Sequence, residues 1–207
     1  MNWIEEIKSM PESEVSRKLA AIKETFVGIP ILKGRNDYPY SLFSLTDYSP
    51  AMKPSLIEDM ADLLVYHGNF KNADIIVSEA DRGGGPLAHA VALRTNLPYT
   101  LANWYPKETV GEVRVEASIG FSGDGYIYLN GILEKQRAIL VDDLLSTGGT
   151  AVALLQAIEK ANAIPLEALF VAEKVGMRGR SAMEEACNIP IKTLVKFKAE
   201  GQRTTDP

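Results

Sequence analysis

The chain has 207 residues, of which 46% are apolar and 24% charged, and its formal net charge is −5. This length and composition allow one domain with a sizeable core, plus at most a small appendage, and exclude wholesale disorder. The single cysteine excludes an intramolecular disulfide, and no stretch approaches the roughly 20 apolar residues of a membrane helix. We therefore expect a soluble, cytoplasmic protein that binds neither membranes nor nucleic acid.

The first part of the chain predicts two helices separated by an irregular region. Pro11 is well placed to open the first helix, because a proline in the first turn loses no needed hydrogen bond. Residues 28–53 are rich in Pro, Gly, Tyr, Asn and Asp, which favours short strands and turns. A second amphipathic helix ends before Gly68. The apolar faces of the two helices are Val15, Leu19, Ile22 and Phe26, and Leu56, Ile57, Met60, Leu63 and Leu64.

From residue 75 onwards, short apolar runs alternate with helical stretches. Strands that are apolar throughout and alternate with helices are typical of a parallel sheet covered on both faces, so we expect an α/β fold. In such sheets ligands bind beyond the carboxyl ends of the strands, and functional residues should directly follow the runs. The runs cover residues 75–77, 98–102, 137–141, 166–172 and 191–195, with helical stretches at 86–93 and 151–161.

The run at 137–141 is followed by an acid pair and a turn rich in hydroxyls and glycines. Asp142 and Asp143 can accept hydrogen bonds from sugar hydroxyls and support a Mg²⁺ shell. Backbone N–H groups in a glycine-containing turn, at the start of a helix, favour an anion such as phosphate. Hydroxyls and glycines of the turn are Ser146, Thr147, Gly148, Gly149 and Thr150. The segment therefore predicts a site for a ribose phosphate.

The segment VDDLLSTGGT resembles the phosphoribosyl-pyrophosphate (PRPP) motif of the type I phosphoribosyltransferases. The resemblance implies a parallel sheet flanked by helices, with a small N-terminal hood over residues 1–53 and the core over 54–207. It implies that Asp142 and Asp143 contact the ribose and that residues 146–150 hold the 5′-phosphate. Mg²⁺ would be held mainly by PRPP and, through water, by the two aspartates. The family also implies a homodimer.

A second glycine-rich loop follows the run at 75–77. Its Arg82, Gly83 and Gly84 could hold an anion through a guanidinium and backbone N–H groups, and the loop resembles the pyrophosphate loop of the family. Relatives usually place an Arg-Lys pair after the next strand. Here the sequence at 103–107 is NWYPK, so that only Lys107 is expected to contact PRPP.

Residues 107–125 resemble the lid that closes over PRPP in this family and keeps water from the reaction. Adenine-specific relatives carry a glutamate in the lid, and Gly120 stands at its place here. Glu112, Glu116 or Asp124 could substitute for it. We take Glu116 as the candidate catalytic acid beside the aspartate pair.

The resemblance implies purine salvage, in which a purine base and PRPP give a nucleotide and pyrophosphate. Residues 173–180 resemble a segment of adenine enzymes, and Ser146 stands where typical hypoxanthine and guanine enzymes carry an aspartate, so adenine is favoured. Glu173 and Phe43 are the expected base contacts, and Tyr38 and Tyr40 could also stack on a purine. Hypoxanthine or guanine is the alternative, because the STGGT loop and residues 125–131 resemble an archaeal hypoxanthine group. A PRPP-binding regulator without catalysis is a further alternative.

Overall fold

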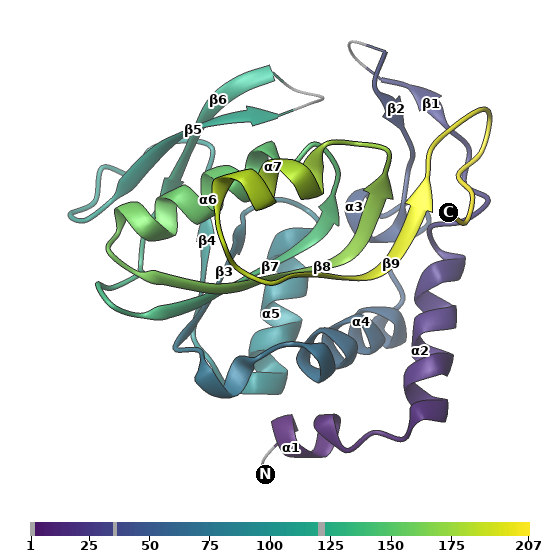
Figure 1. Ribbon diagram of the computed structural model, residues 1–207, viewed down its shortest axis with the longest axis horizontal. Coiled ribbons are helices and arrows are strands. Elements are labelled where there is room, and N and C mark those ends of the chain that lie inside the picture. Colours follow the sequence, from purple (N-terminus) through teal and green to yellow (C-terminus); the bar gives the residue numbers. More distant parts are fainter. Residues whose placement is uncertain (1–2, 35–36, 120–122) are drawn as a thin grey trace.

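A five-stranded parallel sheet forms the centre of the protein (Figure 1), in a computed structural model that describes residues 3–34, 37–119 and 123–207. The order of its strands is β4-β3-β7-β8-β9, and every neighbouring pair is parallel. The sheet confirms the α/β fold predicted from the alternating runs. Its strands are β3 (Ile75–Glu79), β4 (Tyr99–Ala102), β7 (Arg137–Leu145), β8 (Ile164–Val175) and β9 (Ile191–Lys198).

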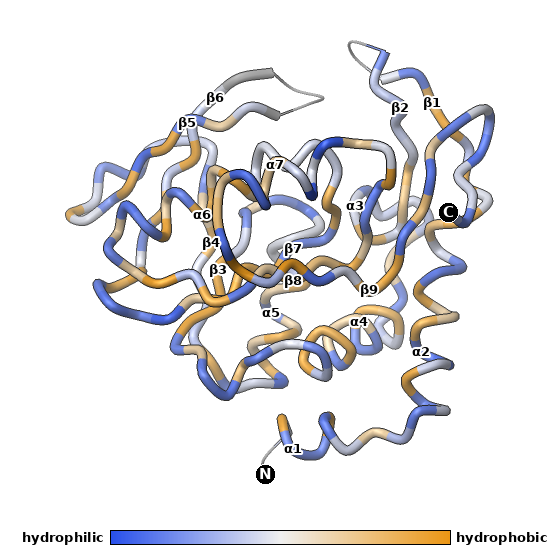
Figure 2. The backbone as a smooth tube through the Cα atoms, in the orientation of Figure 1, coloured by the Kyte–Doolittle hydropathy of each residue, from blue (hydrophilic) through white to orange (hydrophobic). Residues whose placement is uncertain are grey.

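Helices cover both faces of the sheet, which explains why its strands are apolar throughout. Ile139 and Val141 of β7 pack with the core on the side of α4 and α5, whereas Ala138 and Leu140 pack with the core on the side of α6. This division follows from the alternation of side chains along a strand. Along α2 and α4, by contrast, polar and apolar residues alternate (Figure 2). The helices are α4 (Pro54–His67), α5 (Gly84–Thr95), α6 (Gly149–Lys160), α7 (Gly179–Ala186) and the 3₁₀ helix η2 (Phe70–Asn72).

The N-terminal region supplies two helices and a small hood above the carboxyl ends of the strands (Figure 1). The hood contains an antiparallel pair, β1 and β2, and the short helix α3. Phe43 fixes it to the core, because its ring lies 4.9 Å from that of Phe26 and 5.2 Å from that of Phe197 of β9. The elements are α1 (Trp3–Lys8), α2 (Glu12–Glu24), β1 (Leu32–Lys33), β2 (Pro39–Tyr40) and α3 (Ser44–Asp47).

The C-terminal segment pairs with the start of the hood. The backbone N–H of Gly28 donates to the carbonyl of Thr204, and that of Ile31 donates to Gln202. α2 itself packs against α4 and β9. The division predicted at residue 53 falls immediately before α4, although the N-terminal helices share the hydrophobic core with the rest of the chain. No helix among the described residues is long and apolar enough to cross a membrane.

The segment predicted as a lid contains an antiparallel hairpin of β5 (Val113–Ile119) and β6 (Gly123–Leu129). The hairpin packs against α6 through β5 and is apolar on that side, with Val113, Ala117 and Ile127 buried. Gly120 and the side chain of Asp124 lie outside the described residues. Closure of this hairpin over a ligand stays a prediction.

Two strands extend further than the apolar runs predicted. β7 continues to Leu145, and its Asp142 is paired in register with Phe170 of β8. The acid pair therefore belongs to the strand and does not begin the turn. β8 likewise continues through Glu173 and Lys174, which the apolar pattern excluded. Pairing with central neighbours outweighs the low strand propensity of charged residues at these positions.

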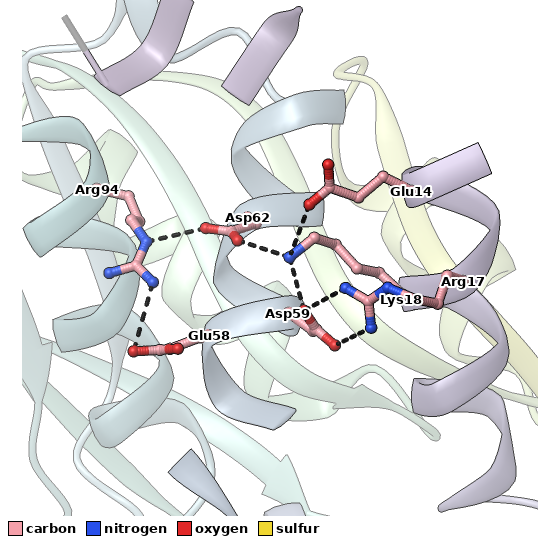
Figure 3. A network of polar contacts seen from close by, with 7 residues as sticks. All are labelled: Glu14, Arg17, Lys18, Glu58, Asp59, Asp62 and Arg94. Atoms are coloured by element: carbon pink, nitrogen blue, oxygen red, sulfur yellow. Dashed lines mark hydrogen bonds and ion pairs between the residues drawn. The ribbon is translucent and has the colours of Figure 1, made fainter. Parts of the chain in front are cut away.

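An ion-pair network joins the N-terminal helix α2 to α4 and α5 (Figure 3). At its centre the buried Lys18 ammonium lies 2.6 Å from Asp59 Oδ1 and 2.9 Å from Asp62 Oδ2. Burial alone would lower the pKa of Lys18, but the hydrogen bonds to these aspartates outweigh it and raise the pKa. Arg94 of α5 continues the network, since its Nε lies 2.9 Å from Asp62 Oδ1.

Replacing Lys18 with methionine is expected to lower the free energy of unfolding by about 2 kcal/mol, because two half-buried carboxylates lose the buried cation that they share. Arg17→Met is a matched control, since Arg17 binds the same Asp59 at 3.4 Å from a side chain that is 60% exposed. An exposed pair of this kind contributes less than about 0.5 kcal/mol. Urea denaturation measures both changes, and equal losses in the two variants would contradict the central place of Lys18.

Candidate active site

A cavity of about 420 Å³ lies between the hood and the carboxyl ends of β3, β7 and β8. Its volume falls in the range of small-molecule sites, and its position is the one expected for ligands of parallel sheets. The cavity receives side chains from elements that are far apart in the sequence. They include Tyr38 and Phe43 of the hood, Glu79 of β3, Asp142 and Asp143 of β7, residues 146–150, and Lys174 of β8.

The turn after β7 is packed closely between two other segments. Gly148 has a φ of 84°, and α6 begins at the next residue. A Cβ on Gly149 would lie 1.5 Å from the carbonyl oxygen of Ser118 in the hairpin, and one on Gly148 would lie 2.8 Å from the carbonyl oxygen of Gly179. The two glycines therefore allow backbones to approach closely on both sides of the turn. The turn points the amino end of α6 at the cavity, an arrangement suited to a phosphate.

Four carboxylates gather on the opposite wall: Glu79, Asp81, Asp142 and Asp143. Burial, followed by the charge of Asp81, raises the pKa of Asp143 to about 8 and that of Glu79 to about 7. Burial and the charge of Asp143 also raise the pKa of Asp142. Among the described atoms Asp142 Oδ1 is buried without a hydrogen-bond partner. This wall therefore suits a ligand that brings hydroxyl donors or a divalent cation.

The loop between β3 and α5 is closed in this structure. Asp81 Oδ1 accepts hydrogen bonds from the backbone N–H groups of Gly83, at 3.0 Å, and Gly84, at 2.6 Å. The guanidinium of Arg82 lies 3.3 Å from Asp47 Oδ1 in the hood. An anion bound by this loop would take the place of the Asp81 carboxylate. The predicted anion donors are thus together, but each is bound by an acid.

Lys174 brings a cation into the cavity beneath the hood. Its ammonium donates to the carbonyl oxygen of Pro39 and lies 4.0 Å from the centre of the Tyr38 ring. Burial lowers the pKa of Lys174 to about 8, so the ammonium form still predominates at neutral pH. The Tyr38 hydroxyl in turn lies 2.5 Å from Ser146 Oγ of the turn after β7.

Comparisons with known proteins decide the family. The chain is 36% identical over 176 residues to a hypoxanthine/guanine phosphoribosyltransferase of Methanocaldococcus vulcanius, covering 85% of this chain and 93% of the relative. It is 31% identical over 185 residues to the enzyme of the same name from Methanosalsum zhilinae, covering 89% and 94%. The chain belongs to the purine phosphoribosyltransferases.

Solved structures of the family share the fold. The adenine phosphoribosyltransferase of Thermoanaerobacter pseudethanolicus has a TM-score of 0.72 at 22% identity, over 86% of this chain and 99% of that one. The Saccharomyces cerevisiae enzyme, solved with adenine, has a TM-score of 0.70 at 22% identity, over 87% and 99%. No family model matches the sequence. A purine phosphoribosyltransferase is a pentosyl-transferring glycosyltransferase of purine salvage, as the resemblance implied.

Five predicted site residues of this phosphoribosyltransferase do not line the cavity. Gly83 and Gly84 are buried against Asp143 and Asp142, and the other three are Glu173, Lys107 and Glu116. Glu173 turns away from it, and its carboxylate is bound by Arg180, with Nη2 at 2.6 Å from Oε2. Lys107 is exposed, with its ammonium 4.5 Å from the Tyr105 ring. Glu116 is exposed on β5 and lines a separate hollow between the hairpin, α6 and α7.

The placements of Glu173 and Glu116 follow from the geometry of their strands. Successive side chains of a strand point to opposite faces, and on β8 Lys174 points to the cavity while Glu173 points to Arg180. The register of the hairpin places Glu116 opposite Tyr126, whose hydroxyl lies 3.3 Å from Glu116 Oε1. The roles of Glu116 and Lys107 stay predictions that depend on a change in the segment 107–129.

The sequence reasoning missed several residues of the cavity wall, among them Lys174, Glu79, Asp81 and Trp104. The indole N–H of Trp104 donates to Glu79 Oε1 at 2.5 Å, and both residues line the cavity. Glu79 and Lys174 both stand at the carboxyl end of a strand, which is the signal that identified the aspartate pair.

Proposed function

We propose that this purine phosphoribosyltransferase acts on 6-oxopurines, hypoxanthine or guanine, with Lys174 as the residue that recognises the base. An ammonium group is a donor only. It pairs with the carbonyl oxygen at C6 of a 6-oxopurine, whereas the 6-amino group of adenine would place donor against donor. The burial of Lys174 beside Tyr38 and Pro39 is the observation that carries the proposal.

The names of the relatives also support a 6-oxopurine as the base. The sequences at 36% and 31% identity are both hypoxanthine/guanine enzymes. The adenine enzymes among the solved structures, at 22% identity, show the fold alone. Adenine, which the sequence favoured because Ser146 stands in place of an aspartate, is therefore the alternative.

The remaining contacts follow the two walls of the cavity. Residues 146–150 bind the 5′-phosphate, Asp142 and Asp143 bind the ribose hydroxyls, and Arg82, Gly83 and Gly84 bind the pyrophosphate once Asp81 is displaced. Phe43 packs at the hood side of the base. Holding the base in line with C1′ of the ribose supplies much of the acceleration. The homodimer and the cytoplasmic location stay predictions.

The cavity wall that carries Asp142 and Asp143 also fits Mg²⁺ bound with PRPP. Buried carboxylate oxygens, one of them without a partner among the described atoms, are the hard ligands that Mg²⁺ prefers. No group of three or more His, Cys, Asp or Glu among the described residues is placed to hold a metal ion. Asp142 and Asp143 would therefore contact the ion through water while PRPP supplies most ligands. When bound, the ion neutralises charge that develops on the departing pyrophosphate.

Replacing Lys174 with methionine is expected to lower kcat/KM for hypoxanthine by about 30-fold, because a hydrogen bond to a charged donor contributes about 1.5–3 kcal/mol. Activity with adenine should change by less than about threefold, since it gains nothing from the ammonium. Pyrophosphate release with PRPP, Mg²⁺ and each base measures both. Lys33→Met, on an 80% exposed side chain of the same hood, is the control. Equal losses for both bases would contradict the proposal, and no release with any base would favour the regulator.

The same lysine predicts a pH dependence. The pKa of Lys174 is about 8, so the charged donor is complete well below pH 8 and is lost as the pH rises through that value. KM for hypoxanthine should therefore be constant from about pH 6 to 7 and rise above pH 8. Lys174→Met serves as the baseline, because it retains any titration of the base itself. If KM for hypoxanthine depended on pH in the same way in the wild-type protein and in Lys174→Met, the ammonium would not contact the base.

A further inference from the structure

Tyr38 contacts both halves of the cavity with one side chain. It directly precedes β2, and its carbonyl accepts a hydrogen bond from the N–H of Gly34 at 2.8 Å. Its hydroxyl lies 2.5 Å from Ser146 Oγ, in the turn that faces the 5′-phosphate site. The face of its ring lies 4.0 Å from the ammonium of Lys174. The side chain therefore spans the distance from the phosphate turn to the base-recognition residue.

The chemistry of the two contacts makes them interdependent. A hydroxyl can donate one hydrogen bond and accept another. When Tyr38 donates to Ser146, the Ser146 hydroxyl is directed to donate onward, to a phosphate oxygen. The ring of Tyr38 meanwhile holds the ammonium by a cation–π contact. A ring placed by the phosphate turn thus also places the donor that meets the base.

The other aromatic residues of the hood that line the cavity make contacts within the hood and the core. The hydroxyl of Tyr40 donates to Asp47 Oδ1 at 2.5 Å, within the hood itself. Phe43, which also lines the cavity, has no polar group and packs on Phe26 and Phe197. Tyr38 contacts both the turn after β7 and Lys174.

We propose that Tyr38 is a positioning residue that couples the two ligand sites, so that a phosphate in the turn at 146–150 strengthens base binding at Lys174, and the reverse. This inference rests on the proposed role of Lys174 in binding the base. Coupling between sites is reciprocal, because each ligand must change the affinity of the other by the same factor. The phenol hydroxyl carries the coupling and the ring alone does not.

The test measures the dissociation constant of ribose 5-phosphate by calorimetry without a base and with saturating hypoxanthine, guanine or adenine. The wild-type protein should bind ribose 5-phosphate about tenfold more tightly with its base present. Tyr38→Phe keeps the ring and removes the hydroxyl, and should reduce this ratio to about two, since one hydrogen bond contributes about 1 kcal/mol. Tyr99→Phe, which loses a hydroxyl bonded to His89 far from the cavity, should keep the wild-type ratio.

A double-mutant cycle with Ser146→Ala separates coupling from a general loss of structure. If the hydroxyl pair carries the effect, Tyr38→Phe should cause no further loss of the ratio once Ser146 is alanine. A wild-type ratio in Tyr38→Phe would overturn the proposal, and so would equal affinity in the wild-type protein with and without base. The same measurement tests the proposed base separately. If adenine, but not hypoxanthine or guanine, increased the affinity for ribose 5-phosphate, 6-oxopurine specificity would be refuted, while the coupling ratio could still be measured with adenine.

Discussion

Replacing Asp143 with asparagine is expected to lower kcat/KM for PRPP by about 100-fold, because a buried acceptor for a ribose hydroxyl is lost and a partner left unsatisfied costs about 1–3 kcal/mol. The substitution preserves the shape of a buried side chain that lies directly against Gly83. Initial rates at varied PRPP measure the loss. Asp206→Asn, on the exposed C-terminal segment, is the control. Wild-type kinetics in Asp143→Asn would remove the aspartate from the ribose site.

The same variant should gain stability in the absence of ligand. The pKa of Asp143 is raised to about 8, whereas an unfolded aspartate titrates near 3.9. Between about pH 4 and pH 8 the folded chain therefore binds more protons than the unfolded chain, and its stability falls as the pH rises. Asp143→Asn should flatten this fall and raise the melting temperature at pH 8. A lower melting temperature at that pH would show that the carboxylate is stabilising without ligand.

Replacing Gly149 with alanine is expected to reduce kcat/KM by at least about 100-fold. The new Cβ would lie 1.5 Å from the carbonyl oxygen of Ser118, so the hairpin and the turn must separate. Both partners are backbone, and neither can rotate away as a side chain could. A displacement of about 1 Å in a ligand-positioning segment can cost 100-fold in rate. KM for PRPP should rise and the affinity for ribose 5-phosphate should fall, and both can be measured directly.

Gly125→Ala is the matched control for Gly149→Ala. Gly125 lies in β6 of the same hairpin, but the nearest atom to its added Cβ, in the Trp104 ring, is 4.0 Å away. It should retain activity within about twofold, since the new methyl group meets only ordinary contact distances. Comparable activity in Gly149→Ala and Gly125→Ala would show that the close approach of hairpin and turn has no part in binding.

The turn after β7 could be predicted from the sequence because its chemistry is local. A buried strand, two acids and a run of hydroxyls and glycines are contiguous, and each has a physical role that does not depend on the rest of the fold. The parallel sheet could be predicted for the same reason, since its strands are apolar on both faces. The boundaries of β7 and β8 could not, because charged residues at their ends are held in the strands by neighbouring strands.

The contacts that depend on register or on distant segments escaped prediction. Glu173 and Lys174 are adjacent and both polar, and only the orientation of β8 shows that the lysine faces the cavity. The bond between Tyr38 and Ser146 joins residues 108 positions apart. Glu116 is exposed because of the register in which the two strands of the hairpin pair, and the sequence of residues 107–125 alone does not predict that register.

A crystal structure with PRPP and Mg²⁺ tests the central claim most directly. The 5′-phosphate should lie within hydrogen-bond distance of backbone N–H groups of residues 146–150, with the ribose hydroxyls on Asp142 and Asp143. An empty turn at 146–150, with the sugar bound elsewhere in saturated crystals, would contradict it.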